Sequence, residues 1–407
     1  MNATPTTQAE ARLLSQGIIL DQVQPKVLTW TLGVQREIMK DTSLELRYLG
    51  TRATQLLVQA RTNTISAFAA GLKPLPTFFD PSQVPATIVG GPRLTDFKNF
   101  DPFIHPEFSL MTAFPPIGSS SYHAGSVDLN RRFARGLMLR ANYTWAHNID
   151  DATNELFSSV VNPRRPLDWM NLALDRANSA LDVRHKFALS WIYEFPNMAT
   201  DSGFLKTLIH GWQWNGTYIA QSGQPLSLLA NADSNANADG AADRAILNPG
   251  GTANLGTAVN YVCAGPGGAT SVASFDPGCV GGSGNVAGYV AKNPNARYVQ
   301  AELGANPTLG RNSFVSPGIN IWNMGMFKNT KLTERATLQF RADAFNVFNH
   351  YNFSLAQPTV FQTGVLIGTV NNALSTTYSN VTSDLFLNPK QFTGGKREMQ
   401  LGVKLIW

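Results

Sequence analysis

Apolar and polar side chains alternate along this chain with a period of two, and no other pattern limits its fold as strongly. In residues 399–407 the side chains of Met399, Leu401, Val403 and Leu405 alternate with smaller or polar ones, with Ile406 as the exception, and the segment ends on Trp407. Successive side chains of a β-strand point to opposite faces. The segment is therefore predicted to be a strand with one apolar and one polar face.

The same alternation returns along most of the chain. The segments that show it are 28–35, 43–48, 121–130, 137–145, 182–195, 212–218, 322–326, 338–344 and 399–407. Several approach the roughly 9 to 11 residues with which a tilted strand crosses a bilayer. Further strands are expected near residues 53–60, 286–301 and 360–370, and no stretch shows sustained helical periodicity.

Charged side chains on one face of these segments indicate which face is wet. They are Glu45, Arg47, Arg140, Arg184, Lys186, Glu194, Arg341 and Asp343. Burying an unpaired charge costs several kcal/mol, so this face is predicted to line a hydrated lumen. The opposite face carries Trp, Tyr, Phe and Leu and would meet lipid, with aromatic residues near strand ends as interfacial girdles. Packing of that face on a second sheet of a soluble protein is the alternative.

Composition favours the membrane interpretation. Asp, Glu, Lys and Arg make up 14% of the 407 residues, against roughly 25% in an ordinary soluble domain. The sequence contains no run of about 18 apolar residues, which a membrane-spanning helix would need. The predicted fold is all-β, an antiparallel transmembrane β-barrel over residues 27–407 after a polar lead-in at 1–26. The net charge is +5, and the basic residues are scattered along the chain rather than clustered, which gives no sign of nucleic-acid binding.

The connections between the predicted strands fall into two classes. Short turns occur at 37–41, 131–136 and 331–336, whereas the long loops are rich in Gly, Pro, Asn and Ser. The long loops span residues 62–120, 148–181, 222–318 and 349–396. Bacterial barrels carry short turns on one rim and long loops on the outer rim, and long loops are the expected place for ligand contact.

Several sequence blocks resemble the carboxy-terminal barrel of Oar-like TonB-dependent receptors. The blocks are YTWAHNIDD at 143–151, DVRHKF at 182–187, GWQ at 211–213, QSGQP at 221–225, GRN at 310–312, WNMGMFKN at 322–329 and LQFRADAFNVFNH at 338–350. The resemblance spans most of residues 27–407. It implies an outer-membrane transporter with about 22 strands and a plugged lumen, energised through TonB and inserted by the barrel assembly machinery through the strand ending at Trp407.

The chain departs from the complete family pattern. It shows roughly half the strands and no recognisable plug or TonB-contact segment, and residues 1–24 lack an export signal. We therefore expect a carboxy-terminal fragment of a longer receptor that is not competent for energised transport alone. In a complete receptor the lumen-facing charges would contact the plug or line a passage, and simple solvation of each is the alternative.

Two features of the loop at 222–318 suggest further chemistry. Cys263 and Cys279 are the only cysteines and bracket a Gly-rich segment. In an oxidising extracellular location they are expected to form a disulfide. Asp233, Asn235, Asn237 and Asp239 alternate with smaller residues, and such spaced side-chain oxygens suit calcium. The spacing departs from that of an EF-hand, and a solvated Asx-rich turn is the alternative.

The six histidines show no HExxH spacing, and neither a nucleophile elbow nor a phosphate-binding loop is present. No enzymatic activity and no cofactor are therefore predicted. Three functions from different classes remain. The first is uptake of a bulky ligand, such as a peptide, glycan or metal chelate, across the cell outer membrane. The others are a structural or adhesive surface barrel and a soluble all-β carbohydrate-binding protein.

Overall fold

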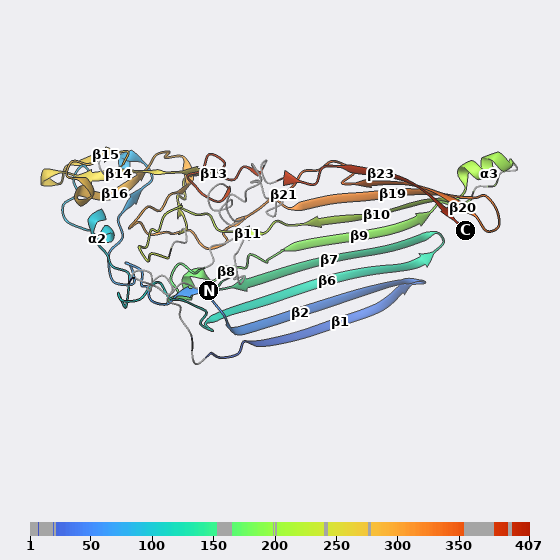
Figure 1. The fold of residues 1–407 in the computed structure, drawn as a ribbon, viewed down its shortest axis with the longest axis horizontal. Helices are drawn as coiled ribbons and strands as arrows, with labels where there is room; N and C mark the ends of the chain where they lie inside the picture. The colour runs from blue at the N-terminus through green and yellow to red at the C-terminus, as the bar shows by residue number, and fades with distance from the viewer. Residues whose placement is uncertain are drawn as a thin grey trace.

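A computed structural model describes residues 22–152, 165–197, 202–239, 243–275, 278–353, 378–389 and 393–407, with the single positions 7, 19 and 199. Nine long strands follow one another in space in the order of the chain and pair antiparallel (Figure 1). They are β1 (Lys26–Met39), β2 (Thr42–Leu56), β6 (Gly118–Ala134), β7 (Leu137–Asp150), β9 (His185–Glu194), β10 (Trp212–Gln221), β19 (Ile319–Lys331), β20 (Thr337–Phe345) and β23 (Glu398–Ile406). Each overlaps one predicted segment, so the prediction of an antiparallel all-β fold is confirmed.

Short elements occupy the connections. The short strands are β3 (Ala60–Arg61), β4 (Thr77–Phe78), β5 (Thr112–Ala113), β8 (Ala177–Asn178), β11 (Pro225–Leu226), β12 (Ile246–Leu247), β13 (Thr252–Thr257), β14 (Val259–Ala264), β15 (Thr270–Ala273), β16 (Val286–Ala291), β17 (Ala296–Val299), β18 (Phe314–Val315), β21 (Asn352–Phe353) and β22 (Thr393–Gly394). The helices are α2 (Leu94–Lys98) and α3 (Gly203–Ile209), with 3-10 turns η1 (Pro81–Gln83), η2 (Leu172–Asp175), η3 (Pro266–Gly268) and η5 (Gly282–Asn285). Among the described residues no helix is both long enough and apolar enough to span a bilayer.

The two ends of the long sheet differ. The short turns and α3 lie at one end, which we call the turn rim, and the long connections gather at the other end, the loop rim (Figure 1). β1 and β23 form the two edges of the sheet in the described part of the chain. The sheet is therefore open, and the total of about 22 strands stays a prediction.

The long connections are more structured than the sequence predicted. β14, β15, β16 and β4 form one small sheet, and β12, β13 and β17 form another. Tyr289, Val299 and Phe97 belong to a buried apolar cluster that these segments share. The expected strands near 286–301 are thus β16 and β17 of the loop region rather than barrel strands, and the one near 360–370 lies outside the described residues. β16 is buried on both faces, so it cannot alternate.

The outward face of the long sheet carries interlocked aromatic rings. Trp191 packs edge to face on Trp214 and Trp322, with ring centroids 5.1 and 6.2 Å apart, and Tyr218 stacks on Trp322 at 3.9 Å. Glycines make room for such rings, because a Cβ on Gly50 would lie 2.2 Å from Trp30. Aromatic rings that cover glycines of a neighbouring strand are a known device for holding strand register.

Candidate functional site: the polar face and the loop rim

Strand register brings the polar side chains of the sheet into continuous rows. Gln35 pairs with Glu45, Glu45 with Asp128, and Asp128 with Asn142 across β1, β2, β6 and β7. Because the period of a strand is two, residues paired in this way point to the same side of the sheet. The separate polar faces of the strands therefore form one surface.

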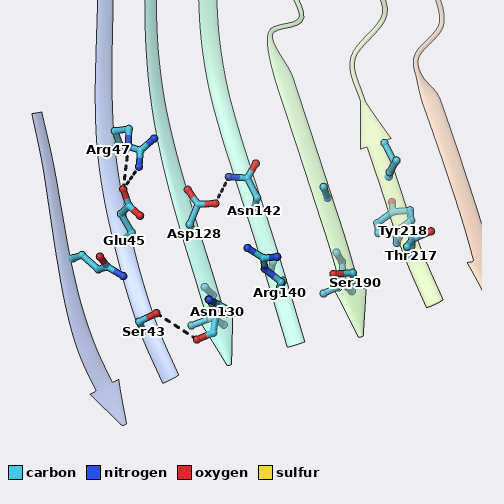
Figure 2. Close-up of a pocket in the computed structure, with 16 residues that line it drawn as sticks. Ser43, Glu45, Arg47, Asp128, Asn130, Arg140, Asn142, Ser190, Thr217 and Tyr218 are labelled. Carbon is cyan, nitrogen blue, oxygen red and sulfur yellow. Dashed lines mark hydrogen bonds and ion pairs between the residues drawn. The ribbon is translucent and has the colours of Figure 1, made fainter. Parts of the chain in front are cut away.

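A groove of about 480 Å³ lies on this surface across the six strands β1, β2, β6, β7, β9 and β10 (Figure 2). Its polar lining consists of Gln35, Ser43, Glu45, Arg47, Asp128, Asn130, Arg140, Asn142, Ser190 and Thr217. Glu45 and Arg47 form an ion pair, and the Asn142 amide donates to the Asp128 carboxylate over 2.6 Å (Figure 2). Opposite charges and amides thus alternate along the groove, which suits a polar ligand or a polar protein surface.

The eight predicted lumen-facing charges are distributed along this face rather than gathered at one point. Glu45, Arg47 and Arg140 line the groove. Arg184 pairs with Asp182 at 2.9 Å and Arg341 with Asp343 at 3.1 Å. Lys186 pairs in register with Thr144 and Gln221, and Glu194 pairs with Gln213. Within the described residues, Arg140 and Lys186 have no ion-pair partner, which leaves both cations available to a ligand.

A buried ionic junction at the loop rim was not predicted from the sequence. Arg311, 7% exposed, forms an ion pair with Asp150 at the end of β7. Its Nη2 and Nε also donate over 2.6 Å to the backbone oxygens of Asp150 and Asp175. Asp175 in turn pairs with Arg244 at 2.5 Å. The junction therefore ties two long connections to the end of a sheet strand.

The neighbouring residue extends this junction. Asn312 donates from its amide to the backbone oxygen of Asn178 over 2.6 Å, and its backbone N–H donates to the Ser227 hydroxyl over 3.1 Å. Asp182 accepts from the backbone N–H of Asn148 over 2.8 Å. Three of the sequence blocks that resemble receptor barrels thus meet at the loop rim, where they hold the loops in place.

Cys263 and Cys279 are joined by a disulfide in the loop region, with Cα atoms 5.5 Å apart and 16 positions apart in sequence. Both are almost fully buried, and Cys263 lies on β14. The bond links the small sheet to the segment that precedes η5. It therefore crosslinks two segments of the loop region that are 16 positions apart in sequence.

Removing the disulfide is expected to destabilise the loop region without unfolding the long sheet. In the chain-entropy model, a closed loop of roughly 15 residues contributes about 3 kcal/mol, so C263S/C279S should lose about that much. Chymotrypsin digestion with and without reductant measures the loss. The reductant should accelerate cleavage of the wild type only. Equal cleavage of the oxidised wild type and the double variant would contradict the prediction.

The side-chain oxygens of the predicted calcium-binding segment make contacts within the protein, most of them inside the same loop. Asp233 accepts from the backbone N–H groups of Asn237 and Ala238 over 3.1 and 2.8 Å. The side chain of Asn235 accepts from the same Asn237 N–H over 3.0 Å, and Asp239 pairs with Arg165 at 3.3 Å. Among the residues with described positions, no group of three His, Cys, Asp or Glu side chains could hold a metal ion. This geometry gives the calcium prediction no support.

Asp243 lies buried at the base of this segment, and we expect it to make the stability of the loop region depend on pH. Burial raises its pKa to about 8, the nearby carboxylates of Asp239 and Asp233 raise it too, and hydrogen bonds from Ser234 and Asn235 oppose the rise. The folded state therefore favours the protonated carboxyl. The resulting stability is complete below about pH 4 and is lost as the pH rises toward 8.

We expect resistance of the loop region to chymotrypsin to fall between pH 4 and 8. D243N, whose amide stays neutral, should flatten this dependence and raise resistance at pH 8. Digestion rates should be normalised at each pH to those of an unfolded substrate. An unchanged slope in D243N would show that other groups cause the dependence.

The fold and its two faces define a membrane barrel protein of the outer-membrane type. The family described as Outer membrane beta barrel domain matches residues 2–400. The chain belongs to this family, and the predicted location in the cell outer membrane is confirmed. The soluble alternative is thereby excluded. A search of curated proteins found no significant match.

Solved structures similar to this chain are outer-membrane receptors and transporters. The outer membrane transporter YddB from Escherichia coli is 10% identical with a TM-score of 0.40, over 95% of this chain and 33% of that one. The pyoverdine outer membrane receptor FpvA from Pseudomonas aeruginosa PAO1 is 9% identical with a TM-score of 0.37, over 94% and 30%. BauA, the ferric preacinetobactin receptor from Acinetobacter baumannii, is 10% identical with a TM-score of 0.37, over 93% and 29%. The chain spans about a third of the length of these proteins.

Proposed function

We propose that this chain forms the carboxy-terminal wall of a TonB-dependent receptor that takes up a bulky ligand, such as a peptide, glycan or metal chelate, across the outer membrane. The groove of about 480 Å³ on the polar face carries the proposal. Its alternating charges and amides suit contact with a plug domain or with a passing polar ligand. Closure of the barrel needs strands that pair with the edges β1 and β23. The strand ending at Trp407 would engage the barrel assembly machinery.

Uptake is tested in cells that do or do not express the complete gene. Labelled peptides, oligosaccharides and ferric chelates serve as probes, with and without a protonophore that removes the energy supply to TonB. We expect at least one class to accumulate only in expressing, energised cells. A loss of that accumulation in R140A/K186A, with normal surface abundance, would assign the passage to the polar face. Equal accumulation of all three classes without the gene would disprove the uptake proposal.

The orientation of the two faces is tested separately by thiol labelling. Asn142 and Tyr143 are neighbours on β7, and Asn142 lines the groove while Tyr143 is 40% exposed on the opposite face. A hydrophilic maleimide should label N142C in lipid vesicles and spare Y143C, and both should react after unfolding. Labelling of Y143C in the folded, lipid-embedded protein would show that the apolar face is not covered by lipid.

A further inference from the structure

A groove on the outward face near the turn rim combines apolar walls with a cation. It encloses about 410 Å³ over β10, β19, β20 and β23. Register places Trp212, Lys328, Phe340 and Val403 in one row across these four strands. On each strand, the residue of this row lies on the same side as the aromatic residues and on the side opposite to the polar ones. The row therefore faces the membrane. The groove is therefore a site on the lipid-facing surface.

Lys328 is unusual for this face because it is a charged residue with only 8% of its surface exposed. Its Nζ donates to the backbone oxygen of His210, which caps the end of α3, and lies 5.8 Å from the centre of the Trp212 ring. An ammonium group has three N–H donors, and this contact uses one. Among the described residues no carboxylate pairs with Lys328. A buried cation without an anion is costly, which favours an anionic ligand here.

The helix beside Lys328 places this site at the membrane surface. α3 exposes the apolar side chains of Phe204, Leu205 and Leu208 at the turn rim. The Trp212 indole N–H donates to the backbone oxygen of Leu208 over 2.9 Å, which fixes the ring against the helix. Exposed apolar residues and tryptophan gather where acyl chains meet headgroups. Since short turns of bacterial barrels face the periplasm, the site lies in the periplasmic leaflet.

We propose that this groove binds an anionic phospholipid of the periplasmic leaflet. One acyl chain lies along Met326, Phe340, Leu401 and Val403, all of which line the groove. The phosphate accepts from the remaining Lys328 N–H donors at the level of Trp212. Complementary charge and an apolar groove long enough for part of a chain select an amphipathic anion. The alternative is that Lys328 serves only to cap the end of α3, in which case no lipid would bind at this site.

Native mass spectrometry of the full chain in mild detergent tests the site. Phosphatidylglycerol and phosphatidylcholine with the same acyl chains are added in equal amounts. Wild type should retain phosphatidylglycerol about fivefold better, the effect of about one lysine at an anionic surface. K328M should lose this preference and K328R should keep it. K404M is the matched control, because Lys404 lies on the opposite face of β23, one position beyond Val403.

Two results would overturn the proposal. One is equal retention of both lipids by the wild type. The other is an unchanged preference in a K328M protein that shows the same heat-modifiable migration as the wild type. A342F provides a second variant that keeps Lys328, because Ala342 lines the groove and a phenyl ring there occupies the place of the acyl chain. Reduced phosphatidylglycerol retention by A342F supports the site even where K328M fails to fold, and full retention refutes it.

Discussion

Alanine in place of Arg311 is expected to release the loop region from the sheet at a cost of about 3–5 kcal/mol. The substitution leaves the carboxylate of Asp150, 6% exposed, without its cation. It also removes donors from the backbone oxygens of Asp150 and Asp175. Burial already raises the pKa of Asp175, and the charges of Arg244 and Arg311 oppose that rise. Losing Arg311 therefore leaves Asp150 without its ion-pair partner and removes one of the two positive charges that offset the burial of Asp175.

Chymotrypsin digestion of the folded protein measures this effect, because the substitution changes no chymotrypsin site. R176A is the matched control. Arg176 pairs with Asp151 at 2.8 Å, but its side chain is 38% exposed. Asp151 also accepts from the backbone N–H and the hydroxyl of Ser119 over 2.7 Å. A loss below about 1 kcal/mol is expected there, so equal sensitivity of R176A and R311A would contradict a special role of the buried junction.

The Arg311→Lys variant separates charge from geometry. Lysine keeps the positive charge but cannot present the planar fork with which arginine reaches several acceptors. We expect a stability between those of wild type and R311A. A lysine variant as unstable as the alanine variant would assign the effect to the hydrogen bonds. A fully stable one would assign it to charge alone.

The long sheet was predictable because each strand has one wet and one apolar face. In β9 the sequence alternates along the strand except at Ile192, and the structure pairs it on both sides in the expected antiparallel manner. β16 gives no such signal, since all six of its residues are buried. Its strand character could be expected from composition, but its place in a separate loop sheet depends on contacts that no local pattern encodes.

The functional residues divide in the same way. Those in the alternating strands could be predicted from the sequence, whereas those that depend on distant contacts could not. Charges such as Glu45 and Arg47 stand out because they interrupt an apolar strand at regular positions. Arg311 could not be found in this way, since its partners Asp150 and Asp175 lie 161 and 136 positions away. Lys328 stands just beyond the segment 322–326, whose alternation is weaker than that of the other strands, and it carries a charge where that alternation requires an apolar residue.

Alanine in place of Gly216 is expected to destabilise the long sheet by about 1–3 kcal/mol, the usual cost of overpacking. A Cβ at this position would lie 2.5 Å from Cζ2 of Trp191 and 2.6 Å from the backbone oxygen of Asn323. Trp191 is 6% exposed and is held between Trp214 and Trp322, so the ring has little space to move. Urea unfolding in detergent, followed by tryptophan fluorescence, measures the loss.

Gly125 supplies the control for this substitution. It lies on the same outward face, and a Cβ there would meet nothing within 4 Å. G125A should therefore unfold at the urea concentration of the wild type or slightly above it, because alanine restricts the unfolded chain more than glycine does. Equal destabilisation by G125A and G216A would mean that glycine itself, and not the space for Trp191, matters in these strands.

A double variant tests whether the aromatic ring is the cause. The close contacts of the added Cβ are with Cζ2 and Cη2 of Trp191, which belong to the six-membered ring of the indole. W191L removes that ring, so G216A should cost less in the W191L background than in the wild type, and the difference is the coupling between the two positions. The contact with the Asn323 oxygen remains in both backgrounds. A cost that does not change with W191L would assign the strain to the backbone of β19 and leave the ring uninvolved.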